Sequence, residues 1–484
     1  MKEKIIAIDQ GTSSTRAVLY DAKGRLLDAA QEEFQQFFPQ EGWVEHNPEL
    51  IWESVLSTLT ALTKKNNLTS SDIASIGITN QRETTIVWNR KTGEPISNAI
   101  VWQDRRTAEF CNSLSSEEKS VQEKTGLTLD PYFSATKLHW LLNNIEGAKE
   151  LAINGDLLFG TVDTYLIWKL TEGRSFKTDV TNASRTMLFN IKEQEWDEDL
   201  LNLFEVPKKM LPEVCDNVHN FGFTTILGGE ITIGGVAGDQ QAALIGQCCF
   251  DPGEVKSTYG TGCFMIVNTG EHILTSENKL LSTIGYRING ETTYALEGSI
   301  FVAGSAVQWL RDGLNLFKDS SETESLAKDA STDSNVLVVP ALTGLGAPYW
   351  DAEARGAIFG LTRDTNIADI TKATLESIIF LSKDLLEAMK KDNANFNSIM
   401  VDGGMVVNNW FCQQLSNILE VQVRRPKIIE TTSLGAGYLA GLHAGVFENI
   451  DSLKTYKQID ETFNPLKESN RYKEWKGAVE KVLT

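Results

Sequence analysis

The sequence predicts an α/β fold built from two related halves, and three observations support this prediction. Strand-like apolar runs such as Ser75–Asn80 alternate with amphipathic stretches such as Pro48–Leu62, where apolar residues recur at helical spacing. A strand followed by a glycine–threonine turn opens the chain at Ile5–Arg16 and recurs at Glu254–Val267. The length of 484 residues also exceeds what one core comfortably supports, so two domains are expected.

The first predicted element is a hairpin suited to binding an anion. Ile5–Ile8 is a short buried strand, Asp9 stands at its open end, and Gly11 permits a sharp reversal. The turn offers amides, hydroxyls and the charge of Arg16 to a phosphate, and Asp9 can hold the Mg²⁺ that accompanies nucleotide phosphates. Taken alone, the segment is explained equally well as an ordinary polar hairpin.

Further strand-like runs are expected along the chain, and glycines punctuate the later ones. Runs at Thr84–Trp88, Asp156–Gly160 and Gly234–Asp239 come before the second hairpin, and Ser398–Gly404 comes after it and leads into a helix start at Asn408. Two hairpins followed by an Asp-Gly-Gly turn indicate two α/β halves that close on one nucleotide.

The boundary between the halves is predicted at the turn formed by residues 249–253. This division gives an N-terminal domain of residues 1–249 and a C-terminal domain of residues 250–484.

Composition excludes several classes of partner. The net charge is −20 and the chain has no basic block, so nucleic acid and anionic membrane surfaces would be repelled. Six cysteines without a Cys-x-x-Cys pair are expected to be free thiols in a reducing cytoplasm. No apolar run approaches the roughly 20 residues of a membrane helix, so we expect a cytoplasmic protein without membrane insertion.

Longer motifs carry a family resemblance. Residues 77–88 (GITNQRETTIVW), 100–107 (IVWQDRRT), 238–244 (GDQQAAL), 259–265 (YGTGCFM) and 344–351 (GLGAPYWD) follow one another in this order. Together they resemble the FGGY carbohydrate kinases along nearly the whole chain. The two general signatures of that family match Tyr132–Asn144 and Gly356–Glu376.

The resemblance implies an actin-like ATPase fold, in which two ribonuclease-H-like domains hold nucleotide and substrate in the cleft between them. It implies ATP-dependent phosphorylation of glycerol to sn-glycerol 3-phosphate, the first step of glycerol catabolism, with ATP and Mg²⁺ required. It also implies a homodimer or homotetramer, with functional coupling to a membrane glycerol facilitator as a further expectation.

The substrate residues follow from the chemistry of glycerol, a small neutral molecule that needs paired donors and acceptors beside apolar surface. Arg82 and Glu83 offer such a pair at the carboxyl end of a predicted strand, although a surface ion pair is the ordinary alternative. Trp102 by itself reads as a core residue. The resemblance implies substrate contacts at Arg82, Glu83, Trp102, Tyr132, Asp239, Gln240 and Phe264.

Asp239 is the predicted general base. Phosphoryl transfer needs a carboxylate that accepts the proton of the attacking hydroxyl, and Asp239 follows a glycine at the end of an apolar strand. An N-cap for the helix predicted at Ala242–Gly246 is the structural alternative, and both roles are compatible.

The nucleotide residues and the metal residues are implied by the resemblance. Mg²⁺ would be positioned, largely through water, by Asp9 and Asp239. Phosphate and adenosine contacts are expected at Thr12, Ser13, Ser14, Arg16, Thr261, Gly304, Gln308, Gly404, Met405 and Asn409.

Two alternative functions remain open at this point. One is a kinase of the same family that acts on a ketopentose, a tetritol or gluconate; the other is a non-enzymatic nucleotide switch of the actin kind. A switch has no reason to carry the constellation of Arg82, Glu83, Trp102 and Asp239.

The sequence also bears on regulation. Some family members are inhibited by fructose 1,6-bisphosphate through a loop containing arginine, and others are activated by phosphorylation of a histidine. Residues 220–232 contain no lysine or arginine, and His219 lacks the aromatic neighbours of the phosphorylated motif, so we expect neither control here.

Overall fold

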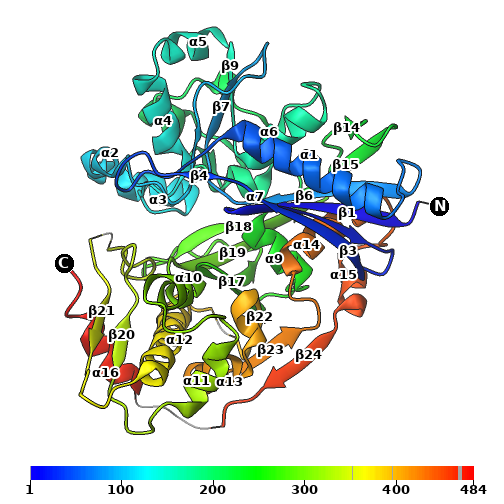
Figure 1. Ribbon diagram of the computed structural model, residues 1–484. Coiled ribbons are helices and arrows are strands. Elements are labelled where there is room, and N and C mark those ends of the chain that lie inside the picture. The colour runs from blue at the N-terminus through cyan, green and yellow to red at the C-terminus, as the bar shows by residue number, and fades with distance from the viewer. Residues whose placement is uncertain (1, 352, 395, 467–470) are drawn as a thin grey trace.

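The computed structural model describes residues 2–351, 353–394, 396–466 and 471–484 of the chain (Figure 1). Two lobes lie one above the other in Figure 1, and each is built around a mixed β-sheet. The upper lobe contains the N-terminal strands, and the lower lobe contains most of the second half of the chain.

The first sheet has six strands. Three antiparallel strands, β1 to β3, are followed by β6, which pairs parallel to β1, and then by β15, which is parallel to β6. Across the sheet the order is β14 (Phe223–Thr224), β15 (Ile231–Gly238), β6 (Ile73–Asn80), β1 (Lys4–Gln10), β2 (Ser14–Tyr20) and β3 (Leu26–Glu33).

The second sheet repeats this plan. The antiparallel strands β16, β17 and β19 correspond to β1, β2 and β3, and the parallel strands β22 and β23 correspond to β6 and β15. Its order is β18 (Leu281–Ile288), β19 (Glu291–Ile300), β17 (Cys263–Gly270), β16 (Val255–Tyr259), β22 (Ser398–Asp402), β23 (Gln422–Pro426) and β24 (Ile459–Phe463). The predicted α/β fold with two related halves is therefore confirmed.

The first hairpin shows why these segments form strands. Ile5, Ile6 and Ile8 of β1 are fully buried, and β2 returns in register with Ile8 opposite Ala17 and Asp9 opposite Arg16. Helix α1 (Pro48–Lys65) begins at the N-cap Asn47, whose side chain accepts a hydrogen bond from Glu49 N. Its apolar stripe packs on β2 and β3, as the helical spacing predicted.

Two helices lie between the sheets and join the lobes. Helix α9 (Asp239–Gly246) follows β15, helix α14 (Thr431–His443) follows β23, and they pack closely against each other. A Cβ atom on Gly435 would lie 1.8 Å from Ala242 O, so glycine is required at this contact. Helix α14 belongs to the second half of the chain but also packs on the first sheet, so contacts join the two predicted domains. The domain boundary between residues 249 and 250 therefore stays a prediction.

The remaining elements cover the sheets or form the outer parts of the lobes (Figure 1). In the first half they are β4 (Gln36–Phe37), β5 (Glu45–His46), β7 (Ile86–Asn89), β8 (Ala99–Ile100), α2 (Ala108–Ser113), η1 (Ser115–Glu117), α3 (Glu118–Thr125), α4 (Ser134–Asn144), α5 (Ala148–Asn154), β9 (Leu157–Gly160), α6 (Val162–Leu170), β10 (Lys177–Asp179), α7 (Val180–Ala183), β11 (Phe189–Asn190), β12 (Glu195–Trp196), α8 (Glu198–Leu203), η2 (Lys208–Met210) and β13 (Glu213–Cys215). In the second half they are α10 (Gly304–Gln308), η3 (Trp309–Gly313), α11 (Glu322–Asp329), β20 (Leu337–Val339), β21 (Ala357–Phe359), α12 (Ile367–Lys391), η4 (Gly404–Val407), α13 (Asn409–Leu419), α15 (Ile450–Leu453), η5 (Lys454–Tyr456) and α16 (Arg471–Val479).

Two expectations from composition can be compared with the fold. All six cysteines are free, as their spacing predicted, and all six are buried. Among the described residues, no helix is both long enough and apolar enough to cross a membrane.

Candidate active site

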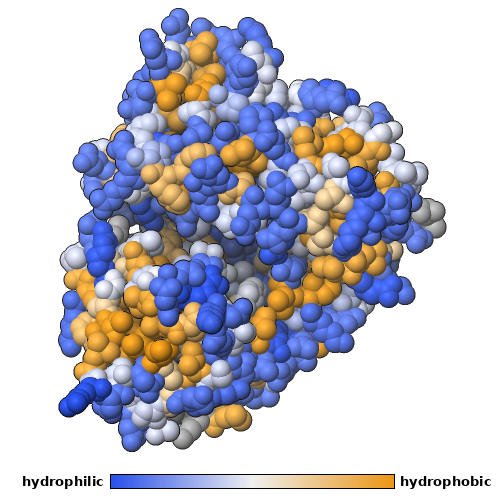
Figure 2. All heavy atoms as spheres, viewed as in Figure 1, coloured by the Kyte–Doolittle hydropathy of each residue, from blue (hydrophilic) through white to orange (hydrophobic). Residues whose placement is uncertain are grey.

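A cavity of about 140 Å³ lies between the lobes, where Figure 2 shows the surface hollowed. Every residue predicted to contact the substrate lines this cavity, although these residues come from both halves of the chain. The lining consists of Thr12, Arg82, Glu83, Trp102, Tyr132, Asp239, Gln240, Thr258, Gly260, Thr261, Gly262 and Phe264.

Strand ends position the polar residues of the cavity. Arg82 and Glu83 follow the last residue of β6, and Asp239 follows the last residue of the neighbouring parallel strand β15. Glu83 has a φ of 59°, an uncommon backbone conformation for a residue with a side chain, and such strain is characteristic of functional sites. The turn around Glu83 also delays the strand predicted from Thr84 until Ile86.

The alternative role of Asp239 as a helix N-cap is wrong. Gly238 occupies the N-cap position of α9, and Asp239 is the first helical residue. Its carboxylate accepts a hydrogen bond from Gln240 N at 2.7 Å, and 28% of the side chain remains exposed. The carboxylate therefore has free acceptor capacity at the cavity.

Three aromatic rings form the apolar walls. The Trp102 ring lies 5.6 Å from the Tyr132 ring and 6.1 Å from the Phe264 ring, both edge to face. Trp102 Nε1 donates a hydrogen bond to Thr12 Oγ1 at 3.0 Å. Trp102 is thus partly exposed at the cavity instead of belonging to the core, and it connects the substrate cavity with the first hairpin.

A buried network of charged side chains lies behind the cavity. Arg82 donates to both carboxylate oxygens of Glu297 from β19, at 2.7 and 2.8 Å, and its Nε lies 3.3 Å from Asp239 Oδ1. Arg185 donates to Glu83 Oε1 at 2.6 Å and to Glu297 Oε1 at 3.2 Å. Burying an unpaired charge lowers the stability of a fold. In this cluster each arginine contacts carboxylates and each carboxylate contacts an arginine, so the buried charges are compensated.

The network sets the ionisation of two carboxylates. Burial raises the pKa of Asp239, and Arg82 and Lys256 oppose that shift. Burial would also raise the pKa of Glu297, but Arg185 and Arg82 outweigh it and lower that pKa to about 2. Asp239 therefore holds a proton more readily than an ordinary aspartate, whereas Glu297 is a permanent anion.

Lys137 of α4 supports the wall formed by Tyr132. Its fully buried ammonium donates to the backbone oxygens of Tyr132 and Phe133, and burial lowers its pKa to about 7, against the opposing effects of Glu83 and Asp104.

This lowered pKa predicts a dependence of stability on pH. Between about pH 7 and the ordinary lysine value of 10.5, the unfolded chain binds a proton that the folded chain does not, so stability should rise with pH. Relative to Lys137→Met, the wild-type free energy of unfolding should rise by up to about 1.4 kcal/mol per pH unit in this window. Urea denaturation at pH 7, 8 and 9 measures the difference. An equal pH dependence in both proteins would contradict the prediction, and the exposed Lys91→Met serves as control.

The residues of the first hairpin surround a tight turn. Gly11 N donates to Ser14 O at 2.9 Å, which closes the reversal and leaves Ser13 exposed. Gln31 donates to Ser14 Oγ, and Arg16 donates to Gln31 and forms an ion pair with Glu430. A phosphate bound at this turn would compete with Glu430 for Arg16.

The predicted adenosine residues lie around the second hairpin. Thr261 O accepts hydrogen bonds from Ala303 N and Ser305 N, and a Cβ atom on Gly304 would lie 2.5 Å from Gly260 O and 3.7 Å from Met405 Cγ. This close approach is why position 304 requires glycine.

The other adenosine residues have looser surroundings. Gly404 and Gln308 are exposed, and Asn409, at the start of α13, accepts a hydrogen bond from Arg425. Of the predicted nucleotide residues, only Thr12 and Thr261 also line the substrate cavity.

Asp9 lies at the end of β1 with a pKa raised to about 7. Burial is the main cause, Arg16 opposes it, and Glu430 and Asp239 add to it. A carboxylate whose charge is disfavoured by a neighbouring carboxylate suits a divalent cation, and carboxylate oxygens are ligands that Mg²⁺ prefers. The donor set at Asp9 and Asp239 therefore fits the predicted metal.

Three residues of the buried network were missed by the sequence analysis: Arg185, Lys256 and Glu297. Lys256 approaches the cavity through a hydrogen bond to Gln240 Oε1 and another of 3.0 Å to Thr258 Oγ1. Each of these residues is a single charged residue within a run of apolar or small residues, as Glu297 is within Tyr294–Ile300. Such a pattern indicates a buried charge, which needs an oppositely charged partner elsewhere in the fold.

A further lysine corrects the analysis of the regulatory loop. Lys177 of β10 lies 3.0 Å from His219 Nε2 and donates to Asn220 O, so a cation does stand beside the loop that lacks one in its own sequence. His219 also packs edge to face on Phe221. The expectation that neither control operates through this loop stays a prediction.

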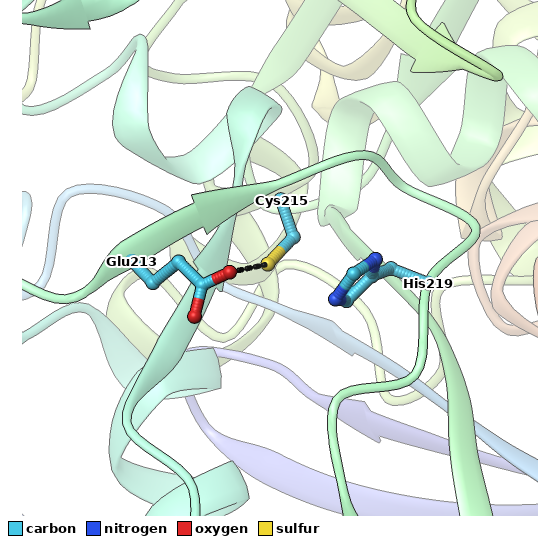
Figure 3. Close-up of side chains that lie close together, drawn as sticks. All are labelled: Glu213, Cys215 and His219. Atoms are coloured by element: carbon cyan, nitrogen blue, oxygen red, sulfur yellow. Dashed lines mark hydrogen bonds between the residues drawn. The ribbon is translucent and has the colours of Figure 1, made fainter.

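Figure 3 shows the side chains around this histidine. Glu213, Cys215 and His219 hold ligand atoms within 4.8 Å of one another, a set of donors that could bind a metal. Lys177 Nζ lies 3.0 Å from His219 Nε2 and 3.9 Å from Glu213 Oε2. The ammonium thus already supplies the positive charge of this group.

Comparison with known proteins now identifies the family. The family model described as "FGGY family of carbohydrate kinases, N-terminal domain" matches residues 4–246, and the corresponding C-terminal domain model matches residues 255–444. The chain belongs to the FGGY family of carbohydrate kinases. Similarity extends over the full length to a glycerol kinase of Marinomonas sp., with 56% identity covering 100% of both chains.

Solved structures of other carbohydrate kinases share the fold. A Plasmodium falciparum glycerol kinase with ADP is 37% identical, with a TM-score of 0.90, over 99% of this chain and 98% of that one. A ligand-bound xylulose kinase from Lactobacillus acidophilus is 25% identical, with a TM-score of 0.85, over 99% and 96%. Since kinases named for different substrates share this fold, the fold cannot identify the substrate.

Proposed function

We propose that this chain is a glycerol kinase, which transfers the γ-phosphoryl group of ATP to glycerol and yields sn-glycerol 3-phosphate. The observation that carries the proposal is the small cavity in which Arg82, Glu83 and Asp239 face three aromatic rings. The proteins of Marinomonas sp. and Plasmodium falciparum, which it resembles over nearly its whole length, are themselves named glycerol kinases.

The cavity favours glycerol over other substrates of this family. A larger sugar such as a ketopentose would need a roomier pocket than the one bounded by Trp102, Tyr132 and Phe264. Gluconate would need a cation for its carboxylate, but the carboxylates of Glu83, Asp239 and Glu297 already surround Arg82. Lys256 is held by hydrogen bonds to Gln240 and Thr258.

The mechanism follows from the positions of these side chains. Arg82 and Glu83 bind the hydroxyls of glycerol, and the aromatic rings contact its carbons and exclude water. Asp239 accepts the proton of a terminal hydroxyl as the new O–P bond forms and the bond from the γ-phosphorus to the bridging oxygen of ADP breaks. Exclusion of water matters because water would otherwise compete as the acceptor.

The hairpins are proposed to hold ATP. Thr12, Ser13, Ser14 and Arg16 bind phosphates from the first lobe and Thr261 binds them from the second, while Gly304, Gln308, Gly404, Met405 and Asn409 contact adenosine. Asp9 and Asp239 would hold Mg²⁺ largely through water, and Mg²⁺ when bound neutralises phosphate charge.

The setting of the enzyme is part of the same proposal. We place it in the cytoplasm as a homodimer or homotetramer that acts on glycerol admitted by a membrane facilitator. Its own partner is the small molecule, since the net charge of −20 disfavours nucleic acid.

The proposal is tested by ADP release with Mg-ATP across glycerol, dihydroxyacetone, erythritol, xylulose, ribulose and gluconate, with the product identified. Turnover dominated by glycerol, yielding sn-glycerol 3-phosphate, is the expected result. Preference for a larger sugar would refute the cavity argument, and ATP hydrolysis that ignores every polyol would indicate a nucleotide switch.

A further inference from the structure

The arginine at the substrate cavity is held by a residue of the opposite lobe. Arg82 follows β6 of the first sheet, whereas Glu297 lies on β19 of the second sheet, 215 positions further along the chain. Arg82 Nη1 donates to Glu297 Oε2 and Nη2 donates to Glu297 Oε1, so the two planar groups meet end to end. Both side chains are at most 1% exposed.

Glu297 is itself held in place. Arg185 donates to Glu297 Oε1 at 3.2 Å, and the hydroxyl of Ser299 donates to the same oxygen at 3.3 Å. Arg185 is fully buried and lies over the rings of Tyr132 and Phe133, so it has no room to follow a displaced carboxylate. The carboxylate of Glu297 is therefore a fixed reference point for Arg82.

The hydrogen bonds to Glu297 leave some of the five N–H groups of Arg82 free to bind another group. Glu297 and Gln241 take both N–H groups of Nη1, and Glu297 takes one of Nη2. The remaining N–H groups are on Nε and Nη2, along one edge of the guanidinium. Arg82 Nε lies 3.3 Å from Asp239 Oδ1 and 3.7 Å from Glu83 Oε1, so this edge faces the two carboxylates that line the cavity.

We propose that Glu297 is a positioning residue for the substrate: by clamping one edge of the Arg82 guanidinium, it aims the free edge at the hydroxyls of glycerol beside Asp239. This inference rests on the proposed function. Its consequence is that a residue of the second lobe, which does not itself line the cavity, controls recognition of glycerol in the first.

Glu297→Gln (E297Q) tests the inference in the full-length enzyme. The amide keeps the shape of the carboxylate but offers one acceptor oxygen, and its NH₂ group opposes the N–H groups of Arg82. We expect kcat/KM for glycerol to fall about 100-fold, mainly through KM, because a misplacement of about 1 Å has that effect. KM for ATP should change less than twofold, since no described hydrogen bond joins Glu297 to either hairpin turn.

Two comparisons separate positioning from a general structural role. Glu376→Gln removes another buried carboxylate of the same lobe, paired with Arg471, and should leave kcat/KM for glycerol unchanged. In an Arg82→Lys background, which has no guanidinium to aim, adding E297Q should lower kcat/KM by less than twofold. A full 100-fold loss in that background would overturn the inference.

The remaining outcomes are equally decisive. If the wild-type chain does not phosphorylate glycerol, the proposed function fails and this inference fails with it. If the wild type is active and folded E297Q keeps kcat/KM within threefold, the inference alone is overturned. If near-ultraviolet circular dichroism shows that E297Q does not fold, Glu297→Asp is the second test. This variant keeps the negative charge but has a side chain shorter by one methylene, so kcat/KM for glycerol should fall at least tenfold. An unchanged kcat/KM would refute the positioning role of Glu297.

Discussion

Replacing Asp239 with asparagine is expected to lower kcat for glycerol by about 10²–10⁴-fold, because the variant lacks the group that accepts the hydroxyl proton. The amide cannot take up a proton at neutral pH, although it occupies the same space at the start of α9. Steady-state ADP release at saturating glycerol and ATP measures the effect.

The fold of D239N should survive this change. The Asp239 side chain is 28% exposed, and the hydrogen bond that it accepts from Gln240 N can equally be accepted by an amide oxygen. The surface aspartate Asp251, paired with Lys454, provides a control, since Asp251→Asn should keep wild-type kcat. Wild-type turnover by a folded D239N would exclude Asp239 as the base.

Replacing Arg82 with methionine is expected to lower the free energy of unfolding by about 3–5 kcal/mol and to abolish saturable use of glycerol. The guanidinium lies within ion-pair distance of Glu83, Asp239 and Glu297, so its removal leaves buried carboxylates with too little compensating charge. Two measurements, urea denaturation and kcat/KM for glycerol, test the two parts of this prediction.

An exposed arginine provides the contrast. Arg25 pairs with Asp21 at the surface and is 66% exposed, so Arg25→Met should change the free energy of unfolding by less than about 1 kcal/mol and leave activity intact. Equal losses of stability in R82M and R25M would show that the buried network is not what makes Arg82 important.

Local signals made much of this fold predictable. The hairpin at Ile5–Arg16 was predictable because an apolar run, a glycine turn and a returning strand are all encoded within a dozen residues. The apolar residues of Pro48–Leu62 recur at helical spacing, so this segment was predictable as a helix without knowledge of its packing partner. The echo of the first hairpin at Glu254–Val267 was enough to predict two related halves, and the repeated strand order confirms it.

The assembly of the candidate site had to come from the tertiary structure. The sequence pointed to Arg82, Glu83 and Asp239, but the partners that orient and neutralise them are Arg185, Lys256 and Glu297, which lie on other elements. Lys177 beside His219 escaped notice for the same reason.

The elements and the family could thus be inferred from the sequence, and the reactive side chains could be predicted from it, because these features depend on neighbours along the chain. The tertiary structure decided which charges face each other, as Arg82 and Glu297 do across the lobes. That outcome depends on how two sheets and the helices between them pack, and no local pattern specifies such a contact.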